Sequence, residues 1–292
     1  MEIKDKEKVR KAVRDKYGEV ARAKSVPFET VLAGTCCSPA DIFSKTSLEP
    51  DCCGGVPDFP MEKLSTVMGY SKEEIDSVPK GANLGLGCGN PVAIASLKPG
   101  ETVVDFGSGG GFDCFLAAKH VGDTGKVIGV DMTPDMVRKA RKNAEKIGIS
   151  NVEFRLGEIE HLPVADNSVD IIISNCVINL SPEKLSVYRD AYRVLKPGGR
   201  LAISDIVATV PLPDDIQKNM ALVAACVGGA ATLEETTEML EEAGFQNIRI
   251  TPKEESREII RACAPDSNVD EYIVSAYIEA EKPGSDRLDN IF

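Results

Sequence analysis

The sequence predicts an α/β fold, with a mostly parallel seven-stranded sheet and helices on both faces. From residue 101 onward, short apolar segments of strand length alternate with segments of helical periodicity. This alternation is the pattern of strand–helix–strand units, whose strands run parallel. The glycine-rich segment 107–111 lies between the first such strand and the first such helix, where a nucleotide-binding loop would lie. A chain of 292 residues, 42% of them hydrophobic, is long enough to bury the core of such a sheet.

The first hundred residues do not follow this alternation. Residues 4–24 place apolar side chains on one face and predict an amphipathic helix. Residues 25–60 are rich in Gly, Pro and Ser and predict loops. A short helix is expected after Ser71, which has the capping-box spacing to Glu74, and the glycine-rich residues 81–91 are expected to be irregular.

Seven segments are expected to be strands, because each is a short, mostly apolar run bounded by turn residues. They are residues 102–106, 126–131, 152–156, 169–174, 200–205, 247–251 and 272–279. The turn Lys-Pro-Gly-Gly at residues 196–199 is expected before the fifth strand. The helices from residue 101 onward are expected at residues 112–120, 133–147, 182–195, 213–226 and 233–243.

Charge and cysteine count restrict the class of protein. The formal net charge of −12 argues against a nucleic-acid partner, because such a partner needs a basic surface. No apolar run approaches the roughly 18 residues of a membrane span, and the charged N-terminal segment lacks the apolar part of a signal peptide. We therefore expect a cytoplasmic protein with no membrane partner. The nine cysteines, an odd number, argue against a disulfide framework, so the thiols are expected to be mostly reduced.

The loop after the first strand carries features of a cofactor site. A dinucleotide fingerprint would need Gly or Ala at position 112, where this chain has Phe112. The carboxylate of Asp105, just before the glycines, would repel a pyrophosphate but suits an amino group or a sulfonium. Asp131 closes the next strand, where it can accept hydrogen bonds from both hydroxyls of a ribose. These features favour S-adenosylmethionine over NAD, although glycines can also form only a tight turn and Asp131 can also cap a helix.

Residues 101–206 resemble a class I S-adenosylmethionine-dependent methyltransferase, whose fold is Rossmann-like. The resemblance is carried by VVDFGSGGGFD, KVIGVDMTPDM, FRLGEIEHLP, VDIIISNCVINL and RVLKPGGRLAISD. It implies that the glycine loop holds the methionine part of the cofactor and that the next strand ends hold its ribose and adenine. The residues expected to bind the cofactor are Tyr17, Asp105, Gly107, Ser108, Gly109, Asp131, Met132, Glu158, Ile159 and Asn175.

A cysteine stands where such enzymes usually place a general base. Asn175 and Cys176 directly follow the fourth strand, so both should reach the ligand crevice beyond the carboxyl ends of the strands. Methyl transfer to an alcohol or amine usually needs a base there. A thiolate instead suits a soft centre such as trivalent arsenic. Held by three thiolates, trivalent arsenic keeps a lone pair that can accept a methyl group without losing a proton.

The segment SNCVINL, with a glycine-flanked cysteine upstream and Cys-Val-Gly-Gly downstream, resembles arsenite methyltransferases from about residue 17 to about residue 283. The resemblance implies that Cys88, Cys176 and Cys226 bind arsenic, as the substrate, and act in its methylation for detoxification. It also implies that one cysteine of the pair Cys36-Cys37 is a redox partner during turnover. Each methyl transfer formally oxidises the arsenic, so the expected partners are arsenite or its thiol conjugates and a thiol reductant of the thioredoxin or glutathione kind.

Three regions are expected along the chain. Residues 1–95 form an N-terminal helix and a Cys-rich loop segment that covers the active site. Residues 96–210 form the S-adenosylmethionine-binding core. Residues 211–292 supply helices and the last strands, which complete the sheet and the arsenic-binding region.

Other functions remain open on the sequence. One is methylation of an organic molecule such as a quinone, with incidental cysteines, and another is non-catalytic, thiol-based binding or sensing of a metalloid. An NAD-dependent oxidoreductase is disfavoured by Phe112 and Asp105. Cys114 and Cys263 are interpreted as packing, because free cysteine is among the most buried residue types. Cys52 and Cys53 stay unassigned, and neither adjacent pair has the C-x-x-C spacing of a zinc site.

Overall fold

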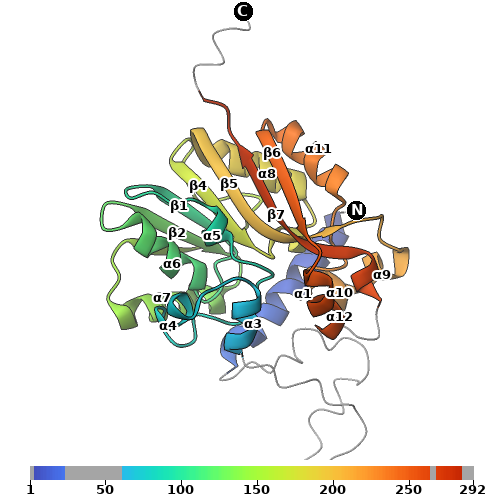
Figure 1. The fold of residues 1–292 in the computed structure, drawn as a ribbon, viewed down its shortest axis with the longest axis horizontal. Coiled ribbons are helices and arrows are strands. Elements are labelled where there is room, and N and C mark those ends of the chain that lie inside the picture. Colours follow the sequence, from blue (N-terminus) through green and yellow to red (C-terminus); the bar gives the residue numbers. More distant parts are fainter. Residues whose placement is uncertain (1–2, 24–60, 264–267, 285–292) are drawn as a thin grey trace, which may run out of the picture.

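The computed structural model describes residues 3–23, 61–263 and 268–284, so Cys36, Cys37, Cys52 and Cys53 lie outside the described residues. The described chain forms a seven-stranded sheet with the order β3-β2-β1-β4-β5-β7-β6. Figure 1 shows this sheet, with every strand except β3 labelled. Strands β1 to β5 pair in parallel, and β7 runs antiparallel between β5 and β6. The predicted fold class is confirmed. The strands are β1 (Thr102–Phe106), β2 (Lys126–Asp131), β3 (Val152–Leu156), β4 (Val169–Asn175), β5 (Leu195–Ala208), β6 (Gln246–Lys253) and β7 (Ile273–Glu281).

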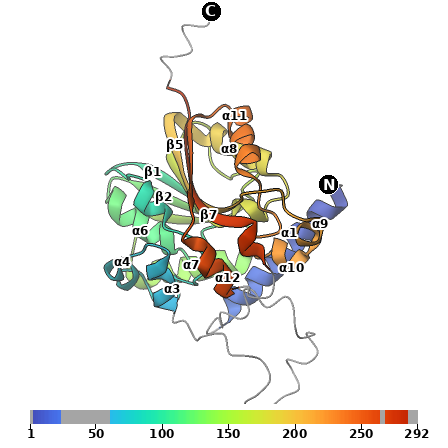
Figure 2. The same ribbon diagram turned by 45° about the vertical axis from the view of Figure 1, so that its right-hand side comes forward.

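The sheet is buried on both faces, as its continuous apolar strands predict. Because side chains alternate along a strand, Val103 and Ile171 pack on one face with α6 (Phe112–Val121) and α7 (Pro134–Ile147). Val104 and Ile172 pack on the other face with α8 (Lys184–Val194) and α11 (Leu233–Ala243). Figure 2 shows α6 and the pair α8 and α11 on opposite sides of the strands.

The N-terminal helix α1 (Ile3–Arg22) crosses the lower side of the sheet in both views and is drawn in blue (Figures 1 and 2). It packs against α7, against the short helix α10 (Met220–Val223) and against the 3-10 turn η1 (Ile178–Leu180). These elements surround the carboxyl ends of the parallel strands. The helix is therefore placed beside the crevice in which sheets of this kind bind ligands. None of the helices described here has the length and apolarity needed to cross a membrane.

Two predicted elements differ in the structure. The helix expected over 213–226 is split into α9 (Asp214–Lys218) and α10 at Asn219, whose backbone is extended and whose side chain accepts the N–H groups of Ala221 and Leu222. Asparagine is a strong N-cap, so it starts a second helix rather than continuing the first. The turn expected at 196–199 lies inside β5, which begins at Leu195, and the pairing of β4 with β5 shifts between Val169 and Ile171.

Several short helices were not predicted. They lack a long periodic run of apolar residues, the signal on which the helix prediction depends. They are α3 (Met61–Val67), α5 (Pro91–Ile94) and α12 (Ser256–Cys263), together with the 3-10 turns η1 and η2 (Val269–Glu271). The short helix after Ser71 is present as α4 (Lys72–Asp76), with the predicted capping box to Glu74.

Candidate active site

A cavity opens at the carboxyl ends of β1, β2 and β4, where the strand order reverses. Its volume is about 1120 Å³ when the open space at its mouth is included. Four loop segments and one helix supply most of its lining. These are residues 82–87, 107–110, 131–133 and 175–177, with Arg10, Val13 and Tyr17 of α1.

The glycine loop is shaped as a cradle. Gly107 has a φ of +64°, and a Cβ at this position would collide with the side chain of Val177. Only glycine combines this left-handed backbone with so close an approach. The hydroxyl of Ser108 is buried in the cavity wall with no hydrogen-bond partner among the described residues. A buried hydroxyl normally has a partner, so a polar ligand in the cradle would satisfy it.

Asp131 closes β2 at the far side of this cradle. Its carboxylate accepts the N–H of Gly109 at 3.0 Å and the N–H of Thr133 at 2.8 Å, which fixes its orientation. Burial raises the pKa of Asp131, and these two backbone N–H groups oppose the shift. Each carboxylate oxygen can accept a further hydrogen bond. The geometry fits a carboxylate that receives the hydroxyls of a ribose.

Two further acids, Asp105 and Asp113, lie in the cavity wall. Asp105 at the end of β1 accepts a hydrogen bond from the thiol of Cys114 at 3.1 Å, and Asp113 accepts one from the hydroxyl of Tyr70 at 2.6 Å. Burial and then the neighbouring Asp113 hold the pKa of Asp105 well above its usual range. Burial raises the pKa of Asp113 to about 6. A cation in the cavity would compensate these buried carboxylates.

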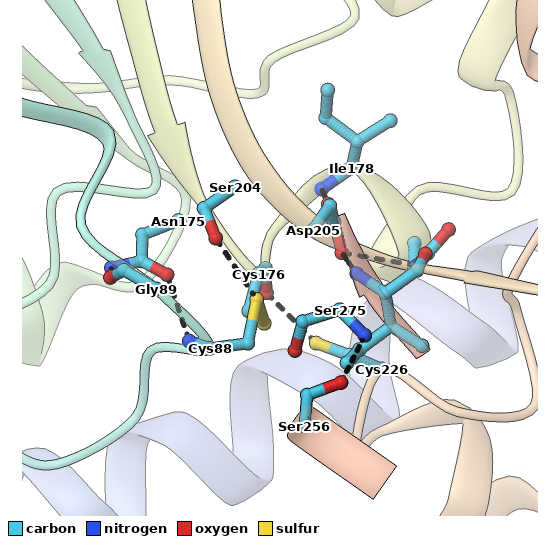
Figure 3. Close-up of a disulfide and its surroundings, with 12 residues drawn as sticks. Cys88, Gly89, Asn175, Cys176, Ile178, Ser204, Asp205, Cys226, Ser256 and Ser275 are labelled. Carbon is cyan, nitrogen blue, oxygen red and sulfur yellow. Dashed lines mark hydrogen bonds between the residues drawn. A yellow bond between two sulfur atoms is a disulfide. The ribbon is translucent and has the colours of Figure 1, made fainter. Parts of the chain in front are cut away.

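The three cysteines expected to act together do converge. Cys88, before α5, and Cys176, after β4, are joined by a disulfide with their Cα atoms 5.9 Å apart. The thiol of Cys226, after α10, donates to the carbonyl oxygen of Cys176 at 2.8 Å, as Figure 3 shows. The thiols were expected to be mostly reduced, and Cys88 and Cys176 are exceptions, whereas Cys114 and Cys226 are free. The Cα spacing of the bonded pair lies within the ordinary disulfide range. In this oxidised form, the described residues contain no cluster of three His, Cys, Asp or Glu side chains that could hold a metal ion.

Two of these cysteines have an unusual backbone. Cys176 has a φ of +55° and Cys226 a φ of +65°, the left-handed region that residues other than glycine and asparagine seldom adopt. Both are buried, and burial raises the pKa of the Cys226 thiol, with the charge of Asp205 adding to the shift. Strained residues of this kind concentrate at functional sites. The raised pKa keeps the thiol of Cys226 protonated, and this neutral thiol lies beside the disulfide.

Comparison with known proteins decides between the families that this geometry allows. A family model described as a methyltransferase domain matches residues 97–244. An arsenite methyltransferase of Halobacterium salinarum is 50% identical over 97% of this chain and 69% of its own length. The chain belongs to the arsenite methyltransferase family.

Other members extend the same result. An arsenite methyltransferase of Aquipseudomonas alcaligenes is 44% identical over 56% of this chain, which spans about half (49%) of that relative's length. The crystal structure of an arsenic(III) S-adenosylmethionine methyltransferase from Chlamydomonas reinhardtii matches 77% of this chain and 73% of its own, with 31% identity and a TM-score of 0.55. The family resemblance seen in the sequence is confirmed.

The structure brings most of the predicted cofactor residues to one cavity. The lining includes Tyr17, Asp105, Gly107, Ser108, Gly109, Asp131, Met132, Ile159 and Asn175. Glu158 is not among the lining residues, whereas Glu160 is. The carboxylate of Glu158 lies 3.6 Å from the guanidinium of Arg10. Cys114 is fully buried, as its interpretation as packing predicted, and it also donates to Asp105.

Sequence reasoning missed Asp113 and Tyr70, although both line the cavity. Asp113 is the only charged residue in the apolar stretch Phe112–Ala118, and a buried carboxylate needs a compensating partner. That isolation was a usable signal. Tyr70 lies outside the alternating part of the chain, where nothing in the sequence connects it to the cavity.

In this arsenite methyltransferase fold, Arg10 holds α1 against the cavity. Its side chain is 13% exposed, and its guanidinium lies 2.6 Å from the carboxylate of Glu183 and 3.4 Å from that of Glu160. Glu160 is nearly buried and also accepts the hydroxyl of Ser181 at 2.6 Å. Removing one partner of a buried ion pair leaves the other charge uncompensated, which costs more than the loss of an exposed pair.

Arg10→Gln is expected to loosen α1, because Glu160 and Glu183 lose their shared cation. Amide hydrogens of residues 3–22 should exchange about ten- to hundredfold faster, measured by mass spectrometry, since the lost interaction is on the order of 1.5–3 kcal/mol. Arg14→Gln on the same helix is the matched control, because Arg14 pairs with Glu7 within α1. Equal exchange in the two variants would contradict a specific role for Arg10.

Proposed function

We propose that this protein transfers methyl groups from S-adenosylmethionine to trivalent arsenic held by Cys88, Cys176 and Cys226, and so converts arsenite to methylated arsenicals for detoxification. The observation that carries the proposal is the convergence of these cysteines from three separate parts of the chain at the cofactor-type cavity. Cys176 itself lines that cavity. A methyltransferase for an organic substrate has no need of such a set of thiols.

The thiols supply the substrate site. Arsenite, As(OH)3, exchanges its three oxygen ligands for three thiols and releases three water molecules. Soft thiolates are suited to this soft centre. The substrate can arrive as arsenite or as a conjugate with small thiols, which then exchange with the cysteines.

A thiol reductant is part of the proposal. The disulfide between Cys88 and Cys176 must be opened before both sulfurs can bind arsenic. Opening it takes two electrons and two protons, which a dithiol or two monothiols of the thioredoxin or glutathione kind supply while becoming a disulfide. A cysteine of the pair Cys36-Cys37 is proposed as a redox partner in the same cycle.

The cavity fits S-adenosylmethionine. When bound, this molecule supplies a methyl group on a sulfonium, which the lone pair of trivalent arsenic can accept while the sulfur keeps the bonding electrons. Asp131 would receive its ribose, the loop at Gly107, Ser108 and Gly109 its methionine part, and Met132 and Ile159 its adenine. The buried acids Asp105 and Asp113 would compensate its positive charge.

Methyl transfer to arsenic requires little proton transfer by the protein. The cavity lining contains neither His120 nor His161, the two histidines of the chain. A lone pair on arsenic has no proton to lose, so no general base is needed. The contribution of the chain is then to position the reacting atoms and to exclude water, with α1 over the cavity.

The direct test is methylation by the purified protein. Incubation with S-adenosylmethionine, arsenite and a dithiol reductant should give methylated arsenic, identified by mass spectrometry. Absence of product with several reductants, despite a folded and reduced protein, would contradict the proposal. Methylation of a quinone-type acceptor that survives Cys176→Ser would favour the organic-substrate alternative, and tight arsenite binding without transfer would favour a sensor.

Cofactor affinity is expected to fall as the pH drops through about 6. Because burial raises the pKa of Asp113 to about 6, the carboxylate becomes protonated below that pH and no longer attracts a cation. The dissociation constant, measured by calorimetry, should then rise by up to about tenfold per pH unit. Asp113→Asn should weaken both affinity at neutral pH and this pH dependence. Asp123→Asn, at an exposed loop position, is the matched control.

A further inference from the structure

The segment that carries Cys88 lies unusually close to two side chains. A Cβ on Gly87 would lie 2.5 Å from the side-chain nitrogen of Asn175. A Cβ on Gly89 would collide with the hydroxyl of Ser204. Real Cβ atoms essentially never approach other atoms within 3.0 Å. The segment can therefore pack this closely against Asn175 and Ser204 only because Cys88 has a glycine on each side.

Asn175 holds the backbone on both sides of the Cys88 side chain. Its side-chain oxygen accepts the N–H of Cys88 at 2.9 Å, and its side-chain nitrogen donates to the carbonyl oxygen of Gly89 at 2.8 Å. The same nitrogen donates to the hydroxyl of Tyr70 at 3.0 Å, which in turn donates to Asp113. Asn175 therefore faces the cysteine segment from inside the cofactor-type cavity, and Figure 3 shows it beside Gly89 and Cys88.

Ser204 on β5 contacts both members of the disulfide. Its carbonyl oxygen accepts the N–H of Cys176 at 2.8 Å, and its hydroxyl lies 3.6 Å from the sulfur of Cys88. Ser204 is fully buried, and within the described chain that sulfur is the hydrogen-bond partner of its hydroxyl. β4 and β5 bring the two residues together, since Asn175 and Ser204 are directly paired in the sheet.

We propose that Ser204 and Asn175 are positioning residues that hold the segment Gly87-Cys88-Gly89 so that the sulfur of Cys88 meets that of Cys176. The value of this arrangement for arsenic rests on the proposed function. Two thiols fixed side by side bind one arsenic atom as a chelate. Once the first thiol has bound the arsenic, the second is present near it at a high effective concentration. Loosening Cys88 lowers that concentration without removing a ligand.

The test uses Ser204→Ala and a control from the neighbouring strand. Ser174 is fully buried, one residue before Asn175 on β4, and its hydroxyl has no hydrogen-bond partner among the described residues. Ser174→Ala therefore makes the same chemical change beside the site without touching Cys88. The probe is phenylarsine oxide, which takes two thiols and releases one water. The full-length protein is first reduced, without S-adenosylmethionine. Protection of Cys88 and Cys176 from alkylation is then read peptide by peptide, so that other cysteine pairs do not contribute.

Ser204→Ala should raise the arsenical concentration for half-protection about three- to tenfold, the range expected for one hydrogen bond. Ser174→Ala should change it less than about twofold. In turnover, Ser204→Ala should raise the KM for arsenite by a similar factor and leave the KM for S-adenosylmethionine unchanged, a split that general loosening of the fold would not produce. Asn175→Ala, which loses both backbone anchors, should weaken protection further.

The outcomes separate the two proposals. Wild-type protection in Ser204→Ala, or equal weakening in Ser204→Ala and Ser174→Ala, would overturn the positioning role. A selective shift in Ser204→Ala together with no methylation by the unmodified protein would support the positioning role and overturn the proposed function. Failure of the arsenical to protect Cys88 and Cys176 in the unmodified, reduced protein would overturn both.

Discussion

Cys176→Ser is expected to reduce arsenite methylation by about a thousandfold or more, an effect of roughly 4 kcal/mol on the transition state. Cys176 lies at the carboxyl end of β4, lines the cavity and is bonded to Cys88. A hydroxyl is a hard, weak ligand for arsenic, so the variant keeps two thiols and an exchangeable oxygen ligand. Product formation measured by mass spectrometry checks this, and cofactor affinity should stay within about threefold because the substitution is nearly isosteric.

The control for this prediction is another buried thiol. Cys114→Ser removes a sulfur near Asp105 but keeps a donor for its carboxylate, and Cys114 lies outside the converging set of cysteines. It should cost less than about tenfold in activity. Methylation by Cys176→Ser within tenfold of the unmodified protein would show that the arsenic is held elsewhere.

Asp131→Ala is expected to weaken S-adenosylmethionine binding by about a hundredfold or more. Hydrogen bonds to a charged group contribute about 1.5–3 kcal/mol each, and the variant would lose the acceptors proposed for two ribose hydroxyls. It also releases the N–H groups of Gly109 and Thr133, so the glycine loop loses the carboxylate that orients it. Calorimetry with S-adenosylmethionine, at matched thermal midpoints of unfolding, measures the effect.

A neighbouring acid tests whether the loss is specific. Asp135 lies four residues further on, in the first turn of α7, where it pairs with Arg22 and Arg138. Asp135→Ala removes the same charge from the same region and should change cofactor affinity less than about threefold. Comparable losses in the two variants would mean that net charge, rather than the position of Asp131, governs binding.

Much of the parallel sheet was predictable because its signal is local. Strands β1 to β4 are short apolar runs bounded by turns, and the glycine loop and Asp131 stand at their ends. The break at Asn219 was missed because the flanking residues continue a helical composition, and the capping geometry of one side chain decides it. Short helices such as α5 carry too few residues for periodicity to be seen.

Some residues of the candidate site could also be predicted from local sequence, and others could not. Cys176 could be placed from its strand, whereas Cys88 and Cys226 are 88 and 50 residues away from it, and their convergence followed only from the resemblance. Ser204 could not be recognised as a functional residue from the sequence, because a serine in an apolar strand is usually part of the packed core. Its contact with Cys88 depends on the pairing of β4 with β5, a register that no local pattern specifies.

The left-handed backbone at Cys176 and Cys226 lowers the stability of the fold, whereas the proposed chemistry needs a side chain with sulfur at both positions. Glycine would adopt these conformations without the cost of about 1–2 kcal/mol that a side chain incurs there. A lineage selected only for a durable fold would drift to glycine or asparagine at both positions. The two sulfur atoms thus lie at positions whose backbone favours glycine, so backbone preference does not account for cysteine at either position, and the retention of both is expected to depend on the role of their sulfur atoms.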